Sequence, residues 1–369
     1  MNTLRDIVDF ETSHPGTPQS LGPSRWNWND IKKVLFIRLR SIGDTVLATP
    51  SIDALKRFLP NAELDILVED WVAPVLSEHP NIDRVISLGR GSLTARARMA
   101  HEVRSRKYDV VYNLHGGTTA TFLTRATGAP HRVGYASYQY SHLHNHQAPS
   151  PLLLWGQQKT HSVEQQLALL GWTGIPVTDR PPTHLAITLD AKARVDYLIS
   201  QSGLAGADFA LIHPAAAFAT KQWSAKNFAQ IVDFLAQRNI GTAAIAAPNE
   251  GAVINELISA SKSRVVPLSL TLPEVSALAA RCRLFVGNDS GIAHIAAAVG
   301  TPSVVVFGSS NIAHWRPWNT APAEVVFEEM PCQPCHGYFC EKFPEPECIL
   351  RVPVGRVVAA VERILAKPH

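Results

Sequence analysis

Short apolar runs alternate with helical patterns along most of the chain. The first run, residues 34–39, is bounded by charged residues and has the length of a buried strand, and the apolar spacing of residues 45–58 predicts a helix. Further strand-like runs follow at residues 64–68, 84–88 and 109–114. Because strands that alternate with helices form parallel βαβ units, this part of the chain predicts an α/β domain.

A second series of the same kind follows a break. Residues 141–151 hold three His and two Pro, which predicts a polar loop, and residues 179–183 include Arg-Pro-Pro. The later predicted elements are strands at residues 209–213, 242–246, 264–267, 284–286 and 303–307, and helices at residues 161–171, 225–238, 292–299 and 354–366. Two α/β series predict two Rossmann-like domains that face each other across a cleft.

The domain bounds follow from these breaks. Residues 1–30 are expected to form an irregular N-terminal extension, which Trp26 and Trp28 dock onto the body. We expect a first Rossmann-like domain at residues 31–185, a second at 186–352, and a C-terminal helix at 353–369. The length of 369 residues agrees with two domains, because domains usually have about 100 to 200 residues.

Composition narrows the class of protein. The chain is 46% hydrophobic and 18% charged, as in globular proteins, and its net charge of +3 is too small to indicate nucleic acid as a partner. No run reaches the roughly 20 apolar residues of a membrane span. The start of the chain carries Asp6 and Asp9 and has no long apolar run, so we expect no signal peptide and a cytoplasmic location. Any membrane contact would be peripheral.

Two turns between a strand and a helix are the first candidates for a binding site. Residues 37–44, IRLRSIGD, follow the first strand and place Asp44 where ligands bind in open α/β sheets. Asp44 either faces a ligand or only caps its helix. Residues 287–294, GNDSGIAH, repeat this pattern, and the free N–H groups of the helix that starts there can bind phosphate without a metal. The alternative is an ordinary capped helix with a structural His294.

Two further charged residues stand near strand ends in the second half. Lys221 comes shortly after the strand that ends at His213, and it either neutralises a pyrophosphate or is a solvated lysine at a helix start. Glu250 closes the next strand, where it either binds a ribose or base or is a plain surface acid.

Taken together and in this order, these segments resemble the ADP-heptose:lipopolysaccharide heptosyltransferase family, glycosyltransferase family 9. The resemblance extends from about residue 32 to the C-terminus and is carried by IRLRSIGD at 37–44, His213-Pro214, KQW at 221–223 and NDSGIAH at 288–294. YDVV at 108–111, RVGY at 132–135 and HSVE at 161–164 are similar to family blocks as well.

The resemblance implies a GT-B fold and an inverting, metal-independent transfer of heptose from ADP-heptose to a lipopolysaccharide inner-core or lipid A-linked acceptor. It implies that the C-terminal helix packs back on the N-terminal acceptor domain, and that the enzyme acts in the cytoplasm, with possible peripheral contact at the inner membrane. No cofactor is implied. The alternatives are the same fold with another nucleotide sugar or acceptor, and a non-catalytic relative that binds glycans or nucleotide sugars.

The resemblance also implies roles for individual residues. Asp44 matches the general base and Lys221 the lysine near the donor phosphates, and the matching donor-binding residues are Glu250, Asp289, Ser290, Gly291 and His294. Arg38, Arg40 and Arg132 are candidates for contact with an anionic acceptor, although each is also compatible with a structural role. Asn113 stands where many relatives have an acid, which puts the acceptor in doubt.

Four of the five cysteines, Cys332, Cys335, Cys340 and Cys348, fall within 17 positions. The C-x2-C start is compatible with a structural zinc site formed by four thiolates. Free or redox-active thiols are the interpretation that we favour over zinc, and disulfides are a third, which a reducing cytoplasm disfavours. We expect no catalytic metal.

Overall fold

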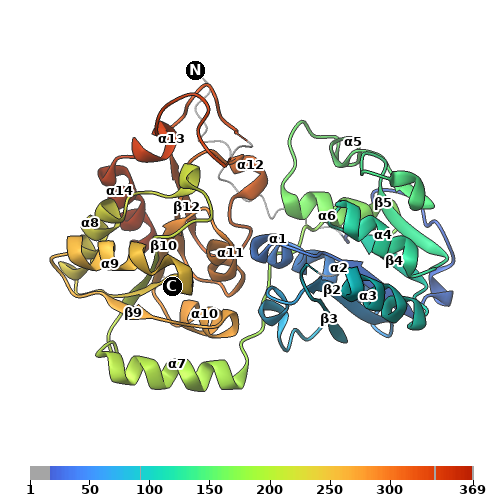
Figure 1. The fold of residues 1–369 in the computed structure, drawn as a ribbon, viewed down its shortest axis with the longest axis horizontal. Coiled ribbons are helices and arrows are strands. Elements are labelled where there is room, and N and C mark those ends of the chain that lie inside the picture. The colour runs from blue at the N-terminus through green and yellow to red at the C-terminus, as the bar shows by residue number, and fades with distance from the viewer. Residues whose placement is uncertain (1–16, 92, 336–337, 368–369) are drawn as a thin grey trace. The chain divides into compact units, whose positions relative to one another are not determined.

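The computed structural model describes residues 17–91, 93–335 and 338–367. Within these residues the chain divides at residue 187 into two compact units, and each unit contains one six-stranded parallel sheet with its own helices (Figure 1). The predicted architecture of two Rossmann-like α/β domains is therefore confirmed. Of the N-terminal extension, residues 1–16 lie outside the described residues.

The first domain has the strand order β3-β2-β1-β4-β5-β6, with every neighbouring pair parallel. Its strands are β1 (Lys33–Ile37), β2 (Glu63–Glu69), β3 (Arg84–Leu88), β4 (Val110–Asn113), β5 (His131–Tyr135) and β6 (His146–Ala148). Its helices are α1 (Ile42–Val46), α2 (Thr49–Phe58), α3 (Leu93–Ser105), α4 (Thr118–Ala126), α5 (Pro151–Trp155) and α6 (Ser162–Trp172).

The second domain repeats this plan with the strand order β12-β11-β10-β7-β8-β9. Its strands are β7 (Phe209–His213), β8 (Gly241–Ile245), β9 (Val266–Leu268), β10 (Leu284–Asn288), β11 (Ser303–Phe307) and β12 (Ala323–Phe327). Its helices are α7 (Leu189–Ser202), α8 (Ala225–Ala236), α9 (Gly251–Ala260), α10 (Leu272–Ala279), α11 (Gly291–Ala298), α12 (Ile312–Trp315), α13 (Glu347–Leu350) and α14 (Val354–Leu365). Numbered within its own domain, each sheet has the order 3-2-1-4-5-6 of a Rossmann fold.

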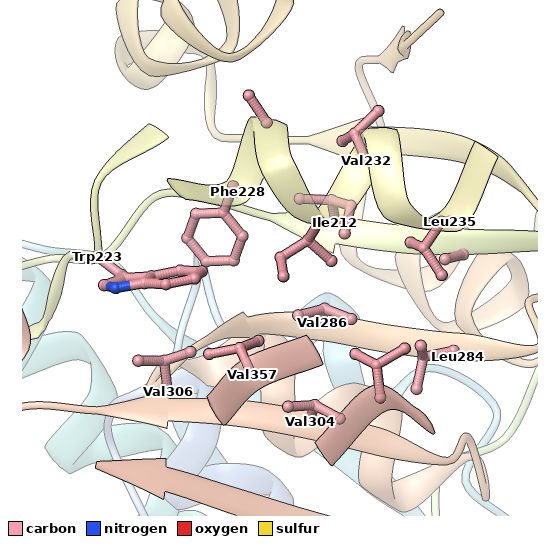
Figure 2. Packing of buried hydrophobic residues seen from close by; sticks show 14 of the residues in the cluster. Ile212, Trp223, Phe228, Val232, Leu235, Leu284, Val286, Val304, Val306 and Val357 are labelled. Atoms are coloured by element: carbon pink, nitrogen blue, oxygen red, sulfur yellow. The ribbon is translucent and has the colours of Figure 1, made fainter. Parts of the chain in front are cut away.

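Each sheet is buried by helices on its faces. In the first domain, Met99 and Val103 of α3 and Leu123 of α4 pack on β-strand residues of one face. In the second domain, α8 directs Phe228, Val232 and Leu235 toward β7, β10 and β11, as Figure 2 shows. Continuous apolar strands such as β11, buried at all five positions, are what a sheet covered on both faces requires.

The C-terminal helix α14 packs in the core of the second domain. Its apolar stripe, formed by Val357, Ala360, Val361 and Ile364, lies in the core of the second domain beside α8, β11 and β12. Figure 2 shows Val357 of this stripe close to Val304 and Val306 of β11. Arg363 binds Glu324 of β12 and Glu362 pairs with Arg238 at the end of α8. The expected contact of this helix with the first domain stays a prediction.

Two local predictions need correction. The helix expected over residues 45–58 is broken between α1 and α2, since Pro50 lacks an N–H and can stand only in the first turn of a new helix. The segment predicted as a polar loop contains β6, which pairs with β5. The described part of the extension is docked as expected: Trp26 stacks on His131 with ring centroids 4.4 Å apart. Among the described helices, none has both the length and the apolarity to cross a membrane.

Candidate active site

The two domains place their candidate residues in equivalent positions. In parallel α/β sheets, ligands bind at the carboxyl ends of the strands where the strand order reverses. That reversal falls between β1 and β4 in the first domain and between β7 and β10 in the second. The loops after these four strands carry Asp44, Lys221 and Asp289.

Asp44 lies in the first turn of α1. Its Oδ2 accepts hydrogen bonds from the backbone nitrogen of Ser41 at 3.1 Å and from the hydroxyl of Ser41 at 3.0 Å, which completes a capping box. The side chain is nevertheless 18% exposed. Asp44 thus caps its helix and still presents a carboxylate to solvent, so the two interpretations of this residue do not exclude each other.

Arg38 holds the other oxygen of Asp44. Its Nη2 pairs with Asp44 Oδ1, and its Nη1 donates to the carbonyl of Leu114 at 2.6 Å, which ties the loop after β1 to the loop after β4. The side chain is only 11% exposed. We expected Arg38 to meet an anionic acceptor, but its guanidinium is used within the protein, where it orients Asp44.

The other two candidate arginines differ from each other. Arg40 leaves 65% of its side chain exposed at the same edge, 4.0 Å from Glu69, and is open to an anion. Arg132 is the second residue of β5, and its guanidinium donates to the carbonyls of Ala129 and Leu143. It stands three residues, about 10 Å, before the carboxyl end of its strand. The structure therefore does not bring Arg132 to the edge that carries Asp44.

His115 was not predicted and lies in this group. Burial, together with the charge of Arg38, lowers the pKa of His115 to about 4, against the opposing charge of Asp44, so the ring is neutral at pH 7. Asn113 fixes the turn, because its side-chain oxygen accepts from the backbone nitrogens of His115 and Gly116. The signal in the sequence was the turn His-Gly-Gly directly after a buried strand.

Asn288, the last residue of β10, connects the two loops of the second domain. Its side-chain nitrogen donates to the carbonyl of Pro214 at 2.8 Å, and its oxygen accepts from the backbone nitrogen of Trp223 at 3.0 Å. Both atoms of this fully buried amide are used. The loop that follows β7, which carries Lys221, is thereby fixed against the end of β10.

The helix α11 begins at Gly291, after Ser290 at the N-cap position. The Ser290 side chain makes no cap hydrogen bond and instead lies 3.3 Å from Nδ1 of His213. Burial lowers the pKa of His213 to about 4, so this ring is neutral. The N–H groups of the first turn of α11 are therefore not satisfied by Ser290, as a turn that receives phosphate requires.

Lys221 and Asp289 are joined by an ion pair. Lys221 Nζ lies 2.8 Å from Asp289 Oδ2, and the Ser310 hydroxyl donates to the same oxygen. The Lys221 side chain is 24% exposed, whereas that of Asp289 is 5% exposed. Lys221 is therefore the part of the pair that meets solvent, and it covers the carboxylate together with Ser310.

The remaining candidate donor residues lie at the same edge or beneath it. Glu250 follows β8, and its Oε2 accepts from the backbone nitrogen of Ala247 at 2.9 Å. It is partly exposed and caps the turn that precedes α9. His294 lies one turn inside α11 and is only 5% exposed, so it is buried beneath this edge.

The four clustered cysteines are all free, so the disulfide interpretation is wrong. Burial and the neighbouring thiols of Cys335, Cys332 and Cys340 raise the pKa of Cys348 to about 11, which keeps it protonated at pH 7. In the described parts of the chain, no three His, Cys, Asp or Glu side chains are arranged to hold a metal ion. The zinc interpretation of this cluster stays a prediction. The backbone nitrogen of Cys335 donates to Ser309, which places this segment beside the donor loops.

Comparisons with known proteins agree with the fold. The family model described as glycosyltransferase family 9 (heptosyltransferase) matches residues 96–343. The chain is 27% identical over 350 residues to lipopolysaccharide heptosyltransferase 3 of Escherichia coli. The aligned region covers 89% of this chain and 97% of that protein.

Two solved structures share the fold. One is the family 9 glycosyl transferase from Veillonella parvula, with a TM-score of 0.79, 21% identity, and coverage of 90% of this chain and 97% of that chain. The other is the ADP-heptose LPS heptosyltransferase II of E. coli, with a TM-score of 0.75, 22% identity, and coverage of 90% and 98%.

Proposed function

Because the chain belongs to glycosyltransferase family 9, the heptosyltransferase family, we propose that it transfers heptose from ADP-heptose to the core of a lipopolysaccharide. The resemblance seen in the sequence is thus confirmed, and the protein is a glycosyltransferase with the GT-B fold. The substrates in the names of its relatives, ADP-heptose and lipopolysaccharide, support the finer proposal. The observation that carries it is the Lys221–Asp289 pair at the switch point of the second sheet.

The second domain is proposed to bind the donor through this pair. The diphosphate of ADP-heptose attracts Lys221 and accepts hydrogen bonds from the first turn of α11, at Ser290 and Gly291. When Lys221 turns toward the phosphates, Asp289 loses its cover and is open to the hydroxyls of the heptose. Glu250, at the end of the neighbouring strand β8, is proposed to contact the adenosine.

The first domain is proposed to bind the acceptor and to supply the base. Asp44 removes the proton from an acceptor hydroxyl, whose oxygen forms a bond to the anomeric carbon while the bond from that carbon to the phosphate of ADP breaks. The proton remains on Asp44 and ADP leaves with the electron pair. Attack from the face opposite ADP inverts the anomeric configuration.

We further propose that transfer requires no metal ion. Negative charge grows on the departing ADP, and Lys221 and the N-terminus of α11 are proposed to stabilise it. Positive charge grows at the same time on the sugar ring, as in glycoside hydrolysis, and the carboxylate of Asp289 is proposed to stabilise that charge.

The test is the release of ADP from ADP-heptose in the presence of heptose-deficient lipopolysaccharide cores. Asp44→Asn should lower kcat by roughly 100-fold or more while the affinity for ADP stays unchanged, because only the proton acceptor is lost. Lys221→Gln should weaken ADP binding by roughly tenfold or more, because a charge-assisted contact is removed.

The matched control is Lys226→Gln, which alters an exposed lysine at the start of α8. It should leave both ADP binding and turnover unchanged. Absence of turnover by the wild type with every core, together with tight ADP binding, would contradict a transferase function. A requirement for divalent cations, seen as loss of turnover in EDTA, would contradict the proposal of a metal-independent reaction.

A further inference from the structure

Positive charge is concentrated in one part of the sequence. Residues 84–163 contain ten Lys or Arg and two Asp or Glu, a formal charge of +8, whereas the whole chain carries +3. The two acids are Glu102 and Asp109, and residues 110–163 contain none. The remaining residues of the chain therefore carry −5. Such segregation has a physical consequence only if the fold brings these cations to one surface.

The helices α3 and α4 carry four of these ten cations as exposed side chains. The two helices pack beside each other over one face of the first sheet (Figure 1). Their apolar residues, such as Met99, Val103 and Leu123, are buried toward the strands. We define the basic face as the exposed residues on the outer side of these helices together with the neighbouring aromatic residue that packs on α4: Arg96, Arg98, Arg104, Phe122, Arg125 and Tyr140.

The cations of the basic face are not neutralised by acids. Within the described residues, no ion pair includes Arg96, Arg98, Arg104 or Arg125. The single acid of α3, Glu102, is paired with Arg106 at 3.2 Å. The two helices also form a continuous surface, because Nη1 of Arg104 lies over Gly128, directly after α4, only 2.0 Å from where a Cβ would stand.

An aromatic pair accompanies these cations. Phe122 is 52% exposed and Tyr140 is 42% exposed, and their ring centroids lie 5.5 Å apart. Phe122 precedes Arg125 by three positions, so both project from the same side of α4. Aromatic rings settle at the headgroup depth of a bilayer, and arginines beside them bind lipid phosphates. Charge alone would also suit a nucleic acid, but two exposed rings beside it favour a lipid surface.

We propose that the basic face docks the first domain on a bilayer that contains acidic phospholipid. The proposal rests on the proposed function, in which the acceptor is anchored in lipid. α4 starts at the carboxyl edge of the first sheet, three residues after His115, and Phe122 lies one turn further along. Docking through α3 and α4 therefore holds the bilayer next to the edge of the domain that carries Asp44.

The test is co-sedimentation of the full-length protein with vesicles of phosphatidylethanolamine and phosphatidylglycerol, compared with vesicles of phosphatidylcholine alone. The wild type should bind only the acidic vesicles, and less strongly as salt increases. The triple variant Arg96→Glu, Arg98→Glu, Arg125→Glu should lose at least about tenfold in partitioning. Phe122→Ser should weaken binding with a smaller dependence on salt, because it removes apolar rather than charged contact.

The matched control is Lys192→Glu, Arg194→Glu on α7 of the second domain. This helix also exposes two cations and an aromatic residue, Tyr197, but Asp190 and Asp196 stand beside them. The control variant should bind acidic vesicles as the wild type does. Equal loss in both variants, or wild-type binding by the triple variant, would overturn the proposal, as would tighter binding to a short DNA duplex than to acidic vesicles.

Vesicle binding does not depend on catalysis, so the two proposals fail separately. The triple variant should retain turnover on a detergent-dispersed acceptor, which also shows that it is folded, and lose turnover on an acceptor embedded in acidic vesicles. If the wild type binds acidic vesicles but transfers no heptose, the proposed function is contradicted and the proposed docking surface is supported. If the wild type transfers heptose and binds no vesicle, the proposal of a docking surface is contradicted.

Discussion

Arg38 uses its charge within the protein rather than toward solvent. It pairs with Asp44 on one side and donates to the Leu114 carbonyl on the other, with little of its side chain exposed. A carboxylate that must accept a proton in a defined direction needs a fixed orientation. Arg38 and the Ser41 cap together leave Asp44 few alternatives.

Replacing Arg38 should therefore affect turnover more than binding. Arg38→Gln removes the charge beside Asp44 and should lower kcat by roughly tenfold or more with little change in the KM for ADP-heptose, and the loss of a buried partner should cost about 3 kcal/mol of unfolding free energy. Steady-state kinetics and thermal melts measure the two effects. Arg38→Lys should restore part of the activity.

Arg40→Gln is the contrast at the same edge. Arg40 is largely exposed, so its replacement should raise the KM for an anionic acceptor without lowering stability. If Arg38→Gln instead raised only the acceptor KM, Arg38 would contact the acceptor and the orienting role would be wrong.

For single residues, the sequence predicted which side chains stand in turns after strands, but it did not predict which side chains they contact. Asp44, Lys221 and Asp289 were predicted because each stands in a turn after a strand. That Lys221 binds Asp289 was not predicted, since 68 residues separate them and only the register of β7 against β10 brings their loops together. His115 was missed because a single histidine in a small-residue turn creates no periodic pattern.

Among the elements, the turn after β11 lies very close to the backbone of a neighbouring loop. A Cβ at Gly308 would lie 2.1 Å from the carbonyl oxygen of Thr220 and 3.0 Å from Ile349. The next residue, Ser309, donates from its backbone nitrogen to that same carbonyl. Gly308 thus lets β11 approach the loop that carries Lys221.

Gly308→Ala should displace that loop. We expect a loss of about 2 kcal/mol of unfolding free energy or more and a weaker affinity for ADP, measured by thermal denaturation and calorimetric titration. Gly355→Ala is the control, because a Cβ there meets no atom within 4 Å in α14 and should stabilise the protein by up to about 1 kcal/mol. If both variants changed stability and ADP affinity equally, the close contact of Gly308 with the Thr220 carbonyl would not be the cause.

Strands could be predicted from the sequence where every residue of the strand is buried. β7 and β11 are buried at every position and were predicted with their observed bounds. β6 and β12 were not predicted, because β6 is a three-residue edge strand within a histidine-rich segment and β12 is mostly half-buried. Edge strands carry little hydrophobic pattern, so whether such a segment forms a strand depends on its pairing with a neighbouring strand.

For the molecule as a whole, each domain buries a histidine that stays neutral. Burial lowers the pKa of His79 in the first domain and of His213 in the second to about 4. The unfolded chain binds these protons near pH 6.5, before the folded protein does. The free energy of unfolding is therefore unaffected above that pH and falls as the pH drops from about 6.5 toward 4, by at most about 1.4 kcal/mol per pH unit for each histidine.

Removing one such histidine should flatten this dependence. His213→Asn, which retains a polar group near Ser290, should lose stability less steeply between pH 6.5 and 4 than the wild type, as measured by thermal melts across that range. His79→Gln should act in the same direction on the first domain. His101→Gln, at an exposed position, is the control and should leave the slope unchanged; a change as large as that of His213→Asn would contradict the assignment.

The two-domain organisation followed from the alternation of strand and helix patterns, whereas the partner of α14 did not. Amphipathic periodicity indicates that a helix buries one stripe but not which sheet covers it. The ion pairs of Arg363 with Glu324 and of Arg238 with Glu362 join residues that are far apart in the chain, and they became visible only in the fold.

The Lys221–Asp289 pair has a consequence for which molecules the second domain accepts. A free heptose offers no negative charge to draw Lys221 away, so it meets a carboxylate that is already occupied. Only a sugar that arrives with its own phosphates exchanges one ionic partner for another. In the proposed mode of donor binding, the pair therefore selects for a phosphate-bearing sugar before the sugar itself is recognised, and it re-forms when ADP leaves.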